Sequence, residues 1–345
     1  MNEDANNSPR PKRRARYSGK NPRRFDQKYK ELDPGKHPET VAKVIASGKT
    51  PAGAHRPICV SEILEALDPK PGQIAVDATL GYGGHAEELL RHIVPGGRLI
   101  GLDVDPLELP RSEARLRHAG FAPDVFTAVH SNFAALAKAL ATLEIPAVDL
   151  IVADLGVSSM QFDRPERGFS FKQAGPLDMR LNPSRGEPAS SLLAKISEEK
   201  LATLLEENSD EPRAAQIAQA ILKHRSSLRQ TTDLARVVRD TMHGNADAET
   251  TVRRVFQALR IAVNGEMSAL EAFLRALPAC LQPSGRVAIL TFHSGEDRRV
   301  KKSFKDGMTT GVYVAISEDV IRPTAQEIHS NPRSASAKLR WAIRA

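Results

Sequence analysis

The stretch Ile74-Ala-Val-Asp-Ala-Thr-Leu-Gly-Tyr-Gly-Gly-His85 decides the fold of this chain. A short apolar run ends at Asp77 and is followed by a turn rich in glycine. A helical pattern comes next, with apolar residues three and four positions apart at Ala86, Leu89, Leu90 and Ile93. A second apolar run, residues 98–102, ends at Asp103. This order, a strand, a glycine turn, a helix and a second strand that ends in an acid, predicts a site for a cofactor that carries an adenosine. The ribose hydroxyls of such a cofactor would bind the carboxylate of Asp103.

The spacing of the glycines distinguishes two kinds of adenosine cofactor. Gly81, Gly83 and Gly84 form the pattern G-x-G-G, whereas a dinucleotide site reads G-x-G-x-x-G and turns a helix N-terminus toward a pyrophosphate. Asp77 precedes the turn, and a carboxylate there suits the ammonium group of S-adenosylmethionine, which has no pyrophosphate. The motif therefore favours this methyl donor, while a turn that only joins a strand to a helix is the alternative.

Length and composition exclude several classes of protein. The 345 residues are enough for one or two domains with a buried core. No apolar run has the length of a membrane-spanning helix, and the N-terminus lacks the apolar segment of a signal peptide. The two cysteines, Cys59 and Cys280, form neither a metal-binding spacing nor a disulfide framework. We therefore expect a cytoplasmic protein with two buried thiols, no bound metal and no membrane partner.

The excess positive charge is confined to one end of the chain. Residues 1–54 contain 13 Lys and Arg against 6 Asp and Glu, and the other residues contain 36 of each kind. The first part of this segment has almost no apolar periodicity, so we predict a disordered basic arm, residues 1–54, ahead of a neutral body. Such an arm either keeps the protein in solution or binds the phosphates of RNA through the release of counterions.

The body of the chain alternates apolar runs with helical patterns. The runs lie at residues 74–76, 98–102, 125–129, 148–153 and 286–292. This alternation is typical of an α/β fold with a mostly parallel sheet. The interval between the fourth and fifth runs is too long for one crossover and is mainly helical in pattern. We predict a sheet domain in two parts, residues 55–162 and 251–345, with an all-helical substrate-recognition insertion, residues 163–250, over the carboxyl edge of the sheet.

A long amphipathic helix is predicted at about residues 249–265. Arg253, Gln257, Arg260 and Asn264 follow one another at three or four positions, so they share its polar face. This face is either a solvated surface, a grip for a phosphate backbone or a brace for the active site. Arg253, Gln257 and Arg260 are therefore candidate substrate-binding residues.

Polar side chains also follow the last core strands. The fourth strand ends at Asp154, and in an open parallel sheet this position lies beside the reactive group of the cofactor. A carboxylate there can orient a nucleophilic amine and take its proton, which makes Asp154 the candidate catalytic residue, with a plain turn-former as the alternative. The last strand delivers His293 and Arg298 next to acids, and Arg333 lies in a basic patch near the C-terminus. These three complete the candidate substrate-binding residues.

The cysteines argue against one type of methylation. Methyl transfer to carbon 5 of a pyrimidine uses a cysteine nucleophile in a turn at a strand tip. Cys59 lies near the start of the fold, and Cys280 lies late in a helical pattern. A nitrogen acceptor is therefore more consistent with this sequence.

Seven motifs occur in the order that is found in a known family. They are Asp-Ala-Thr-Leu-Gly-Tyr-Gly-Gly-His at 77–85, Asp-Leu-Gly-Val-Ser-Ser at 154–159, Glu-Arg-Gly-Phe-Ser-Phe at 166–171, Gly-Pro-Leu-Asp-Met-Arg at 175–180, Phe-Gln-Ala-Leu-Arg-Ile at 256–261, Phe-His-Ser at 292–294 with Glu-Asp-Arg at 296–298, and Asn-Pro-Arg at 331–333. Over about residues 55–345 the chain resembles the ribosomal RNA small subunit methyltransferase H family, the bacterial cytosine-N4 methyltransferases. The third and fourth motifs are the most specific of the seven.

The resemblance implies a fold, a cofactor and a substrate. The fold is that of a class I, Rossmann-like methyltransferase with an inserted helical domain. The methyl donor is S-adenosylmethionine, and the acceptor is a cytosine in the decoding region of 16S rRNA, within the small ribosomal subunit or its precursor. The family's cofactor contacts correspond here to Gly83, Gly84, His85, Asp103, Phe133, Asp154 and Gln161. Phe133 suits an apolar wall for adenine, and Gln161 suits an amide near the amino-acid end of the donor.

The chain departs from the family pattern at four places, none of which touches the cofactor contacts; two of them, the short region between 305 and 330 and the basic arm, concern RNA docking. Gly295 stands where leucine is usual, and residues 55–58 read His-Arg-Pro-Ile instead of a run of the His-Thr-x-Val type. The region between residues 305 and 330 is shorter than in the family, and the basic arm is not part of the family pattern. The family lacks the Asp-Pro-Pro-Tyr type motif of DNA amino-methyltransferases, so the resemblance assigns no catalytic base. Two other interpretations stay open: a methyltransferase for an amine in DNA or protein, and an RNA-binding assembly factor with this fold and no catalysis.

Overall fold

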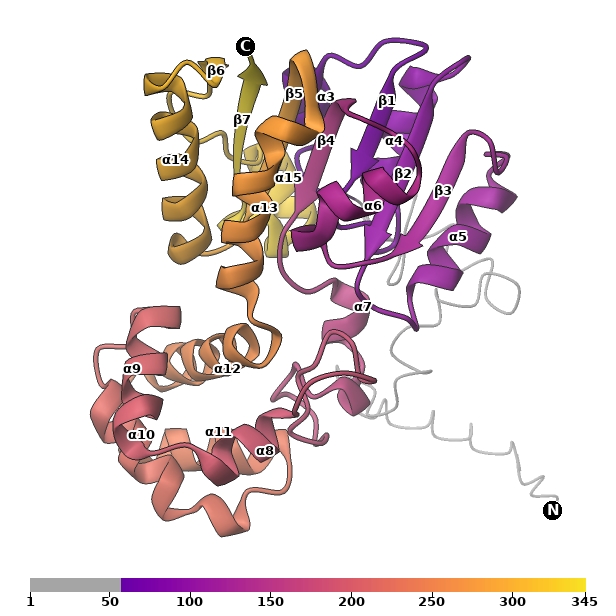
Figure 1. Cartoon of the computed structure of the whole chain (residues 1–345). Coiled ribbons are helices and arrows are strands. Elements are labelled where there is room, and N and C mark those ends of the chain that lie inside the picture. The colour runs from indigo at the N-terminus through magenta and orange to yellow at the C-terminus, as the bar shows by residue number, and fades with distance from the viewer. Residues whose placement is uncertain (1–56) are drawn as a thin grey trace, which may run out of the picture. The chain divides into compact units, whose positions relative to one another are not determined.

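The computed structural model describes residues 57–345, so the predicted basic arm at 1–54 lies outside the described residues. One sheet of seven strands has the order β3-β2-β1-β4-β5-β7-β6 (Figure 1). The strands are β1 (Ile74–Asp77), β2 (Arg98–Asp103), β3 (Phe126–His130), β4 (Val148–Asp154), β5 (Leu281–Thr291), β6 (Tyr313–Ile316) and β7 (Lys338–Arg344). Strands β1 to β5 pair in parallel, and β7 is antiparallel to both β5 and β6. The five predicted runs form the parallel part of the sheet, as expected.

The helices include every amphipathic segment that the sequence predicts. They are α3 (Val60–Leu67), α4 (Gly84–Ile93), α5 (Leu109–His118), α6 (Leu136–Thr142), α7 (Ser159–Phe162), α8 (Ala189–Lys195), α9 (Glu198–Ser209), α10 (Ala214–Lys223), α11 (Thr231–Thr241), α12 (Ala248–Asn264), α13 (Glu266–Cys280), α14 (Ser294–Thr309) and α15 (Ala325–Ser330). Within residues 57–345, no helix combines the length and the apolar composition that are needed to cross a bilayer.

Helices cover both faces of the sheet. On one face, α6, α13 and α14 bury side chains such as Phe273 and Phe304 against the strands. On the other face, α3, α4 and α5 bury side chains such as Leu89 and Leu116. Because both faces of the central strands are covered, their sequences read as continuous apolar runs instead of alternating ones. The layers confirm the α/β class, and the strand order with its antiparallel β7 is that of a class I methyltransferase.

Parallel pairing brings three acids to one edge of the sheet. Strand β1 ends at Asp77, β2 at Asp103 and β4 at Asp154. Asp77 pairs with Gly101 of β2 on one side and with Val152 of β4 on the other, so the three strands end within two residues of the same level. The carboxyl edge is where open α/β sheets bind ligands.

Helices α8 to α12 build a separate buried cluster, whose residues run from Phe169 to Leu259. This helical part follows α7 and returns to the sheet through α12 and α13; Figure 1 shows it beyond the carboxyl ends of β1 to β4. The predicted insertion at 163–250 falls within this region. Its predicted end lies in the first turn of α12, and α12 packs against α9 and α11 along much of its length.

One strand begins earlier than the sequence suggests. The apolar run starts at Arg286, but β5 already begins at Leu281, which pairs with Val148 before the register shifts at Leu150. Residues Gln282 to Gly285 read as a turn because they contain a proline, a serine and a glycine. The irregular pairing accommodates them at the start of the strand, next to the end of α13.

Candidate active site

The glycine turn between β1 and α4 adopts the backbone conformation that its sequence requires. Gly81 and Gly83 have positive φ angles of 49° and 82°. A Cβ atom on Gly83 would lie 3.1 Å from both Arg115 and Leu116 of α5, so a larger residue would be strained and crowded. The turn thus packs tightly against α5 while its open side faces the carboxyl edge of the sheet.

Side chains of α5 hold this turn. The sequence did not predict these contacts. Arg115 donates from Nε to the carbonyl oxygen of Tyr82 at 2.9 Å and from Nη2 to that of Gly83 at 2.7 Å. Its guanidinium also pairs with Glu87 of α4, and the hydroxyl of Ser112 donates to the carbonyl oxygen of Gly81. The carbonyl oxygens of the turn are thus bound by α5, while the N–H groups of Gly81 and Gly83 donate to Asp103 and to the carbonyl oxygen of Leu80 at 2.6 Å.

Asp103 connects the turn to the end of β2. Its Oδ2 accepts a hydrogen bond from the backbone N of Gly81 at 2.7 Å, and its Oδ1 accepts one from that of Asp105 at 2.8 Å. Burial raises the pKa of Asp103 to about 6, against the effect of these two bonds. Each carboxylate oxygen retains a second lone pair, so the group fits two ribose hydroxyls, as the motif predicts.

Two further carboxyl groups lie at the same edge. Asp77 is buried, accepts a hydrogen bond from the backbone N of Thr79 at 3.1 Å, and has a pKa that burial raises to about 6. Burial, assisted by the charge of Glu296, raises the pKa of Asp154 to about 7. The backbone N of Asp154 donates to the Thr79 hydroxyl at 2.5 Å, which ties β4 to the turn after β1. Three acids at one edge of the sheet suit a ligand that carries positive charge, such as an ammonium or a sulfonium.

His85 lies at the start of α4, between the glycine turn and Asp154. The residue is 6 % exposed. Its Nε2 is 2.9 Å from the carbonyl oxygen of Ile58, and its Nδ1 is 3.7 Å from a carboxylate oxygen of Asp154. Gly84 beside it packs against the ring of Pro57, so the segment before α3 closes this side of the site.

The other predicted cofactor contacts, Gln161 and Phe133, are held by neighbours. The Oε1 of Gln161 accepts a hydrogen bond from the backbone N of Ser158 at 3.0 Å, and its Nε2 donates to Asp105 at 2.7 Å. Asp105 is fully buried and also pairs with Arg167 at 2.7 Å. Phe133 follows β3, and its ring stands edge-on to Phe273 of α13 with 5.4 Å between centroids. Gln161 is therefore fixed by a network that includes Asp105 and Arg167, two residues whose part in the site is not evident from the sequence.

The polar face of α12 turns mainly toward other parts of the protein. Arg260 pairs with Glu266 at 2.8 Å, and Gln257 donates to the carbonyl oxygen of Asn208 at 3.0 Å. Asn264 donates to the carbonyl oxygen of Met179 and accepts from the backbone N of Leu181. Arg253 is exposed, and its guanidinium donates to the hydroxyl of Thr250. Of the three interpretations of this face, that of an internal brace fits Gln257 and Arg260, which bind other parts of the protein. Arg253, in contrast, is exposed to solvent.

His293 and Arg298 lie together at the start of α14. His293 is the N-cap of this helix, and its Nε2 lies 3.2 Å from Glu296. Although burial opposes it, the hydrogen bond and charge of His293 lower the pKa of Glu296. Arg298 is exposed and pairs with Asp210 at the end of α9, at 3.3 Å. The start of α14 thus joins the sheet to the helical part.

Arg333 lies apart from α14. It pairs with Asp163 at 2.7 Å, and its guanidinium lies over the ring of Phe162 at 5.7 Å from the centroid. The contacts link the C-terminal segment to the end of α7, the helix that contains Gln161, and to the loop that follows it.

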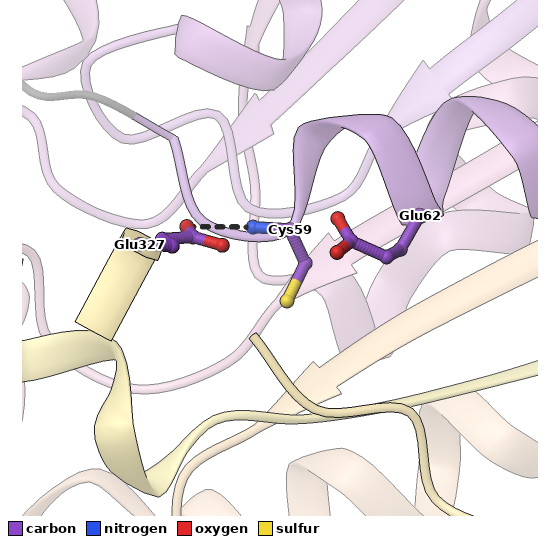
Figure 2. A group of neighbouring side chains, drawn as sticks. All are labelled: Cys59, Glu62 and Glu327. Carbon is purple, nitrogen blue, oxygen red and sulfur yellow. Dashed lines mark hydrogen bonds between the residues drawn. The ribbon is translucent and has the colours of Figure 1, made fainter. Parts of the chain in front are cut away.

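Cys59, Glu62 and Glu327 form a small cluster at the start of α3 and in α15 (Figure 2). The backbone N of Cys59 donates to Glu327 at 3.0 Å, so the cluster links the start of α3 to α15. Burial and the nearby carboxylates raise the pKa of the Cys59 thiol to about 12, and burial raises that of Cys280. Neither thiol is a thiolate at neutral pH, which agrees with the argument against a cysteine nucleophile. The expected absence of a metal stays a prediction.

Comparison with known proteins identifies related chains. The family model described as the MraW methylase family matches residues 52–345. The chain is 50 % identical to the ribosomal RNA small subunit methyltransferase H 1 of Lachnoclostridium phytofermentans, with 99 % of this chain and 95 % of the relative covered. It is 48 % identical to the ribosomal RNA small subunit methyltransferase H 2 of Alkaliphilus metalliredigens, with 99 % of both chains covered. The family model starts at residue 52, yet both alignments also include the basic arm.

Proposed function

The chain belongs to the MraW methylase family, and we propose that it methylates the exocyclic N4 amine of a cytidine in the decoding region of 16S rRNA. Its methyl donor is S-adenosylmethionine. The observation that carries the proposal is the position of Asp154, a carboxyl group with a pKa of about 7 at the tip of β4, at the same edge of the sheet as the glycine turn and Asp103. The family and the relatives' names support the small-subunit rRNA as substrate.

Each predicted contact has a part in holding the donor. We propose that the backbone N–H of Gly84 and the carboxylate of Asp103 bind its two ends, the amino acid and the ribose, and that Gly83 lets the backbone approach the ligand closely. Phe133 supplies an apolar wall for the adenine, and Gln161 supplies a fixed amide near the amino-acid end. The donor brings an electrophilic methyl group on a sulfonium, whose positive charge the carboxyl groups of Asp77 and Asp154 complement.

Asp154 has two tasks in this proposal. It accepts a hydrogen bond from the exocyclic amine, which aligns the nitrogen with the methyl carbon; such alignment supplies most of the rate of a displacement of this kind. As the bond between the amine nitrogen and the methyl carbon would form, the bond between that carbon and the sulfonium sulfur would break and leave a neutral thioether, so the nitrogen would become cationic and would have to release one proton. An oxygen of Asp154 takes that proton, because a carboxyl group with a pKa near 7 is both a competent acceptor and able to release the proton to solvent afterwards.

The predicted substrate-binding residues divide into two groups in this proposal. Arg253, Arg298 and Arg333 have exposed guanidinium groups, which suit the phosphates of RNA. Gln257 and Arg260 are bound inside the protein, so we propose that they fix α12 and α13 rather than contact RNA. His293 holds Glu296 and the start of α14 beside the carboxyl edge of the sheet.

A methyl-transfer assay with competing acceptors tests this proposal. The protein is incubated with donor labelled in the methyl group and, separately, with small ribosomal subunits, naked 16S rRNA, large-subunit rRNA, duplex DNA and ribosomal proteins. We expect label in the small-subunit rRNA only. Label in DNA or protein would favour the alternative amine substrates. An absence of label, with tight binding to the rRNA, would favour an assembly factor without catalysis.

A further inference from the structure

The cluster of Cys59, Glu62 and Glu327 brings three side chains that can bind a metal ion to one place. The sulfur of Cys59 and one carboxylate oxygen of each glutamate all lie within 4.8 Å of one another. Cys59 and Glu62 stand at the start of α3, whereas Glu327 belongs to α15 and lies 268 residues beyond Cys59 in the sequence. Figure 2 shows the sulfur between the two carboxylates. The cluster therefore joins two helices that are distant in the sequence.

The two carboxylates of this cluster have no basic partner. Neither Glu62 nor Glu327 forms a salt bridge with any residue between 57 and 345. Over the same residues their side chains accept one hydrogen bond, which the backbone N of Cys59 donates to Glu327 at 3.0 Å. Two like charges at this distance repel each other unless a positive charge lies close to both. The pair of carboxylates thus suits a bound cation.

The thiol of Cys59 is a second and independent sign of a ligand. The residue is 0 % exposed, and within residues 57–345 its sulfur has no hydrogen-bond partner. The sulfur points toward the two carboxylates (Figure 2). A cation that binds there would displace the thiol proton and take the thiolate as a ligand. The other cysteine, Cys280, is also buried, but in the described part of the chain it belongs to no such cluster.

The ligand types select the kind of metal. Mg²⁺ and Ca²⁺ prefer sites built from oxygen alone, so the sulfur argues against both ions. Zn²⁺ binds thiolate sulfur at about 2.3 Å and carboxylate oxygen at about 2.0–2.2 Å, usually with four ligands in a tetrahedron. Glu62 and Glu327 are partly exposed, so their side chains can rotate to approach an ion to these distances. Three protein ligands leave the fourth position to a water molecule.

We propose that Cys59, Glu62 and Glu327 bind one zinc ion, which clamps the start of α3 to α15. The carbonyl oxygen of Ile58, next to Cys59, lies 2.9 Å from Nε2 of His85, so the clamp also steadies the segment that His85 contacts. The spacing of the two cysteines predicts no bound metal, and the proposal replaces that expectation. A spacing could not reveal this site, because one of its ligands comes from the other end of the fold.

Cobalt and zinc titrations test the site. The full-length protein is freed of metal with a chelator and titrated with Co²⁺, which shows a charge-transfer absorption band when a thiolate binds it. We expect one Co²⁺ per chain with this band, and displacement of Co²⁺ by Zn²⁺. Cys59→Ala should lose the band and bind zinc more than about 100-fold more weakly, because even a residue behind a ligand contributes about 10–100-fold to affinity. Cys280→Ala is the matched control and should keep the band.

The glutamates are tested without removing the buried thiol. Glu62→Gln and Glu327→Gln should weaken zinc binding, because an amide is a neutral ligand; Glu327→Gln keeps an oxygen for the backbone N of Cys59, which preserves the link between the helices. Glu65→Gln, at an exposed position of the same helix α3, is the control and should bind zinc as the wild type does. Zinc should raise the midpoint of thermal unfolding of the wild type and of the Glu65→Gln variant more than that of the two others.

Several outcomes would overturn the inference. They are the absence of a thiolate band in the wild-type protein, a band that persists in Cys59→Ala, and a band that is lost in Cys280→Ala. Equal zinc affinity of Glu62→Gln and Glu65→Gln would exclude the carboxylate of α3 as a ligand. If Cys59→Ala does not fold, the glutamine variants still decide the question. None of these measurements uses methyl transfer, so their result is independent of the proposed function.

Discussion

The Nδ1 atom of His85 lies 3.7 Å from a carboxylate oxygen of Asp154. The other ring nitrogen, Nε2, is 2.9 Å from the carbonyl oxygen of Ile58, and a carbonyl can only accept, so Nε2 carries the hydrogen. The Nδ1 side of the ring therefore faces Asp154. Burial and the charge of Glu296 raise the pKa of Asp154 to about 7. The proposed proton acceptor is thus balanced between its two states near neutral pH.

Replacing Asp154 separates orientation from proton transfer. Asp154→Asn should keep the fold and much of the donor affinity, because the amide has the same shape and can still bind a ligand. It should lower the rate of methyl transfer about 10²-fold or more, because an amide is a poor proton acceptor. Single-turnover rates at saturating donor and RNA measure this, since slow product release would hide a slower chemical step. Asp124→Asn, at an exposed position, is the control.

A methyl-transfer rate of Asp154→Asn within a few-fold of the wild-type rate would mean that Asp154 only positions its ligand. The proton acceptor would then be sought at the start of α14, where His293 and Glu296 lie 3.2 Å apart.

The raised pKa of Asp154 has a consequence for stability. Its carboxyl group titrates near 3.8 in the unfolded chain and near 7 in the folded one, so between these values the folded protein binds more protons. The free energy of unfolding therefore falls as pH rises from about 4 to 7, as far as this group contributes. Asp154→Asn removes the effect, so the stability of the variant relative to the wild type should increase with pH. Urea unfolding between pH 4 and 8, without donor, measures it; a constant difference would mean that Asp154 is not perturbed.

Asp103 is predicted to contribute to donor affinity. Asp103→Ala should weaken binding of S-adenosylmethionine by about 1.5–3 kcal/mol, which is the scale of hydrogen bonds to a charged group. Calorimetry gives the affinity, and thermal unfolding checks the fold, because the variant also loses two backbone hydrogen bonds. Unchanged affinity in a folded variant would remove Asp103 from the donor site.

Local patterns predict much of this fold because they reflect local causes. The apolar runs become strands that are buried on both faces, and Gly81 and Gly83 stand where the turn needs positive φ angles. The acids at 77, 103 and 154 are found at one edge because parallel strands end together. Such features can be predicted from the local sequence together with the general rules for parallel sheets.

Side-chain partners that are distant in the sequence are not predictable in this way. Arg115 binds a turn more than 30 residues earlier, and Arg167 pairs with Asp105, 62 residues away. The polar face of α12 was identified correctly as a face, but the partners of Gln257 and Arg260 depend on how the helical part packs. A helical period shows which side chains share a face, not which neighbour that face meets.

The basic arm supplies a prediction that rests on the sequence alone. Deleting residues 1–50 should leave donor binding intact, weaken RNA binding and flatten its dependence on salt, because the segment 1–54 holds all of the net positive charge. Binding of an rRNA fragment at several salt concentrations measures this. An unchanged slope of log K against log salt would make the arm a solubilising segment.

The identity of the methylated nucleoside tests the central claim most directly. Small ribosomal subunits and naked 16S rRNA are incubated with the protein and with donor whose methyl group carries a heavy isotope, and the digested nucleosides are analysed by mass spectrometry against standards. The account predicts heavy N4-methylcytidine from the decoding region, absent when the Asp154→Asn variant replaces the wild type over the same time. Heavy 5-methylcytidine, a methylated nucleoside of another base, or no heavy nucleoside at all would contradict it.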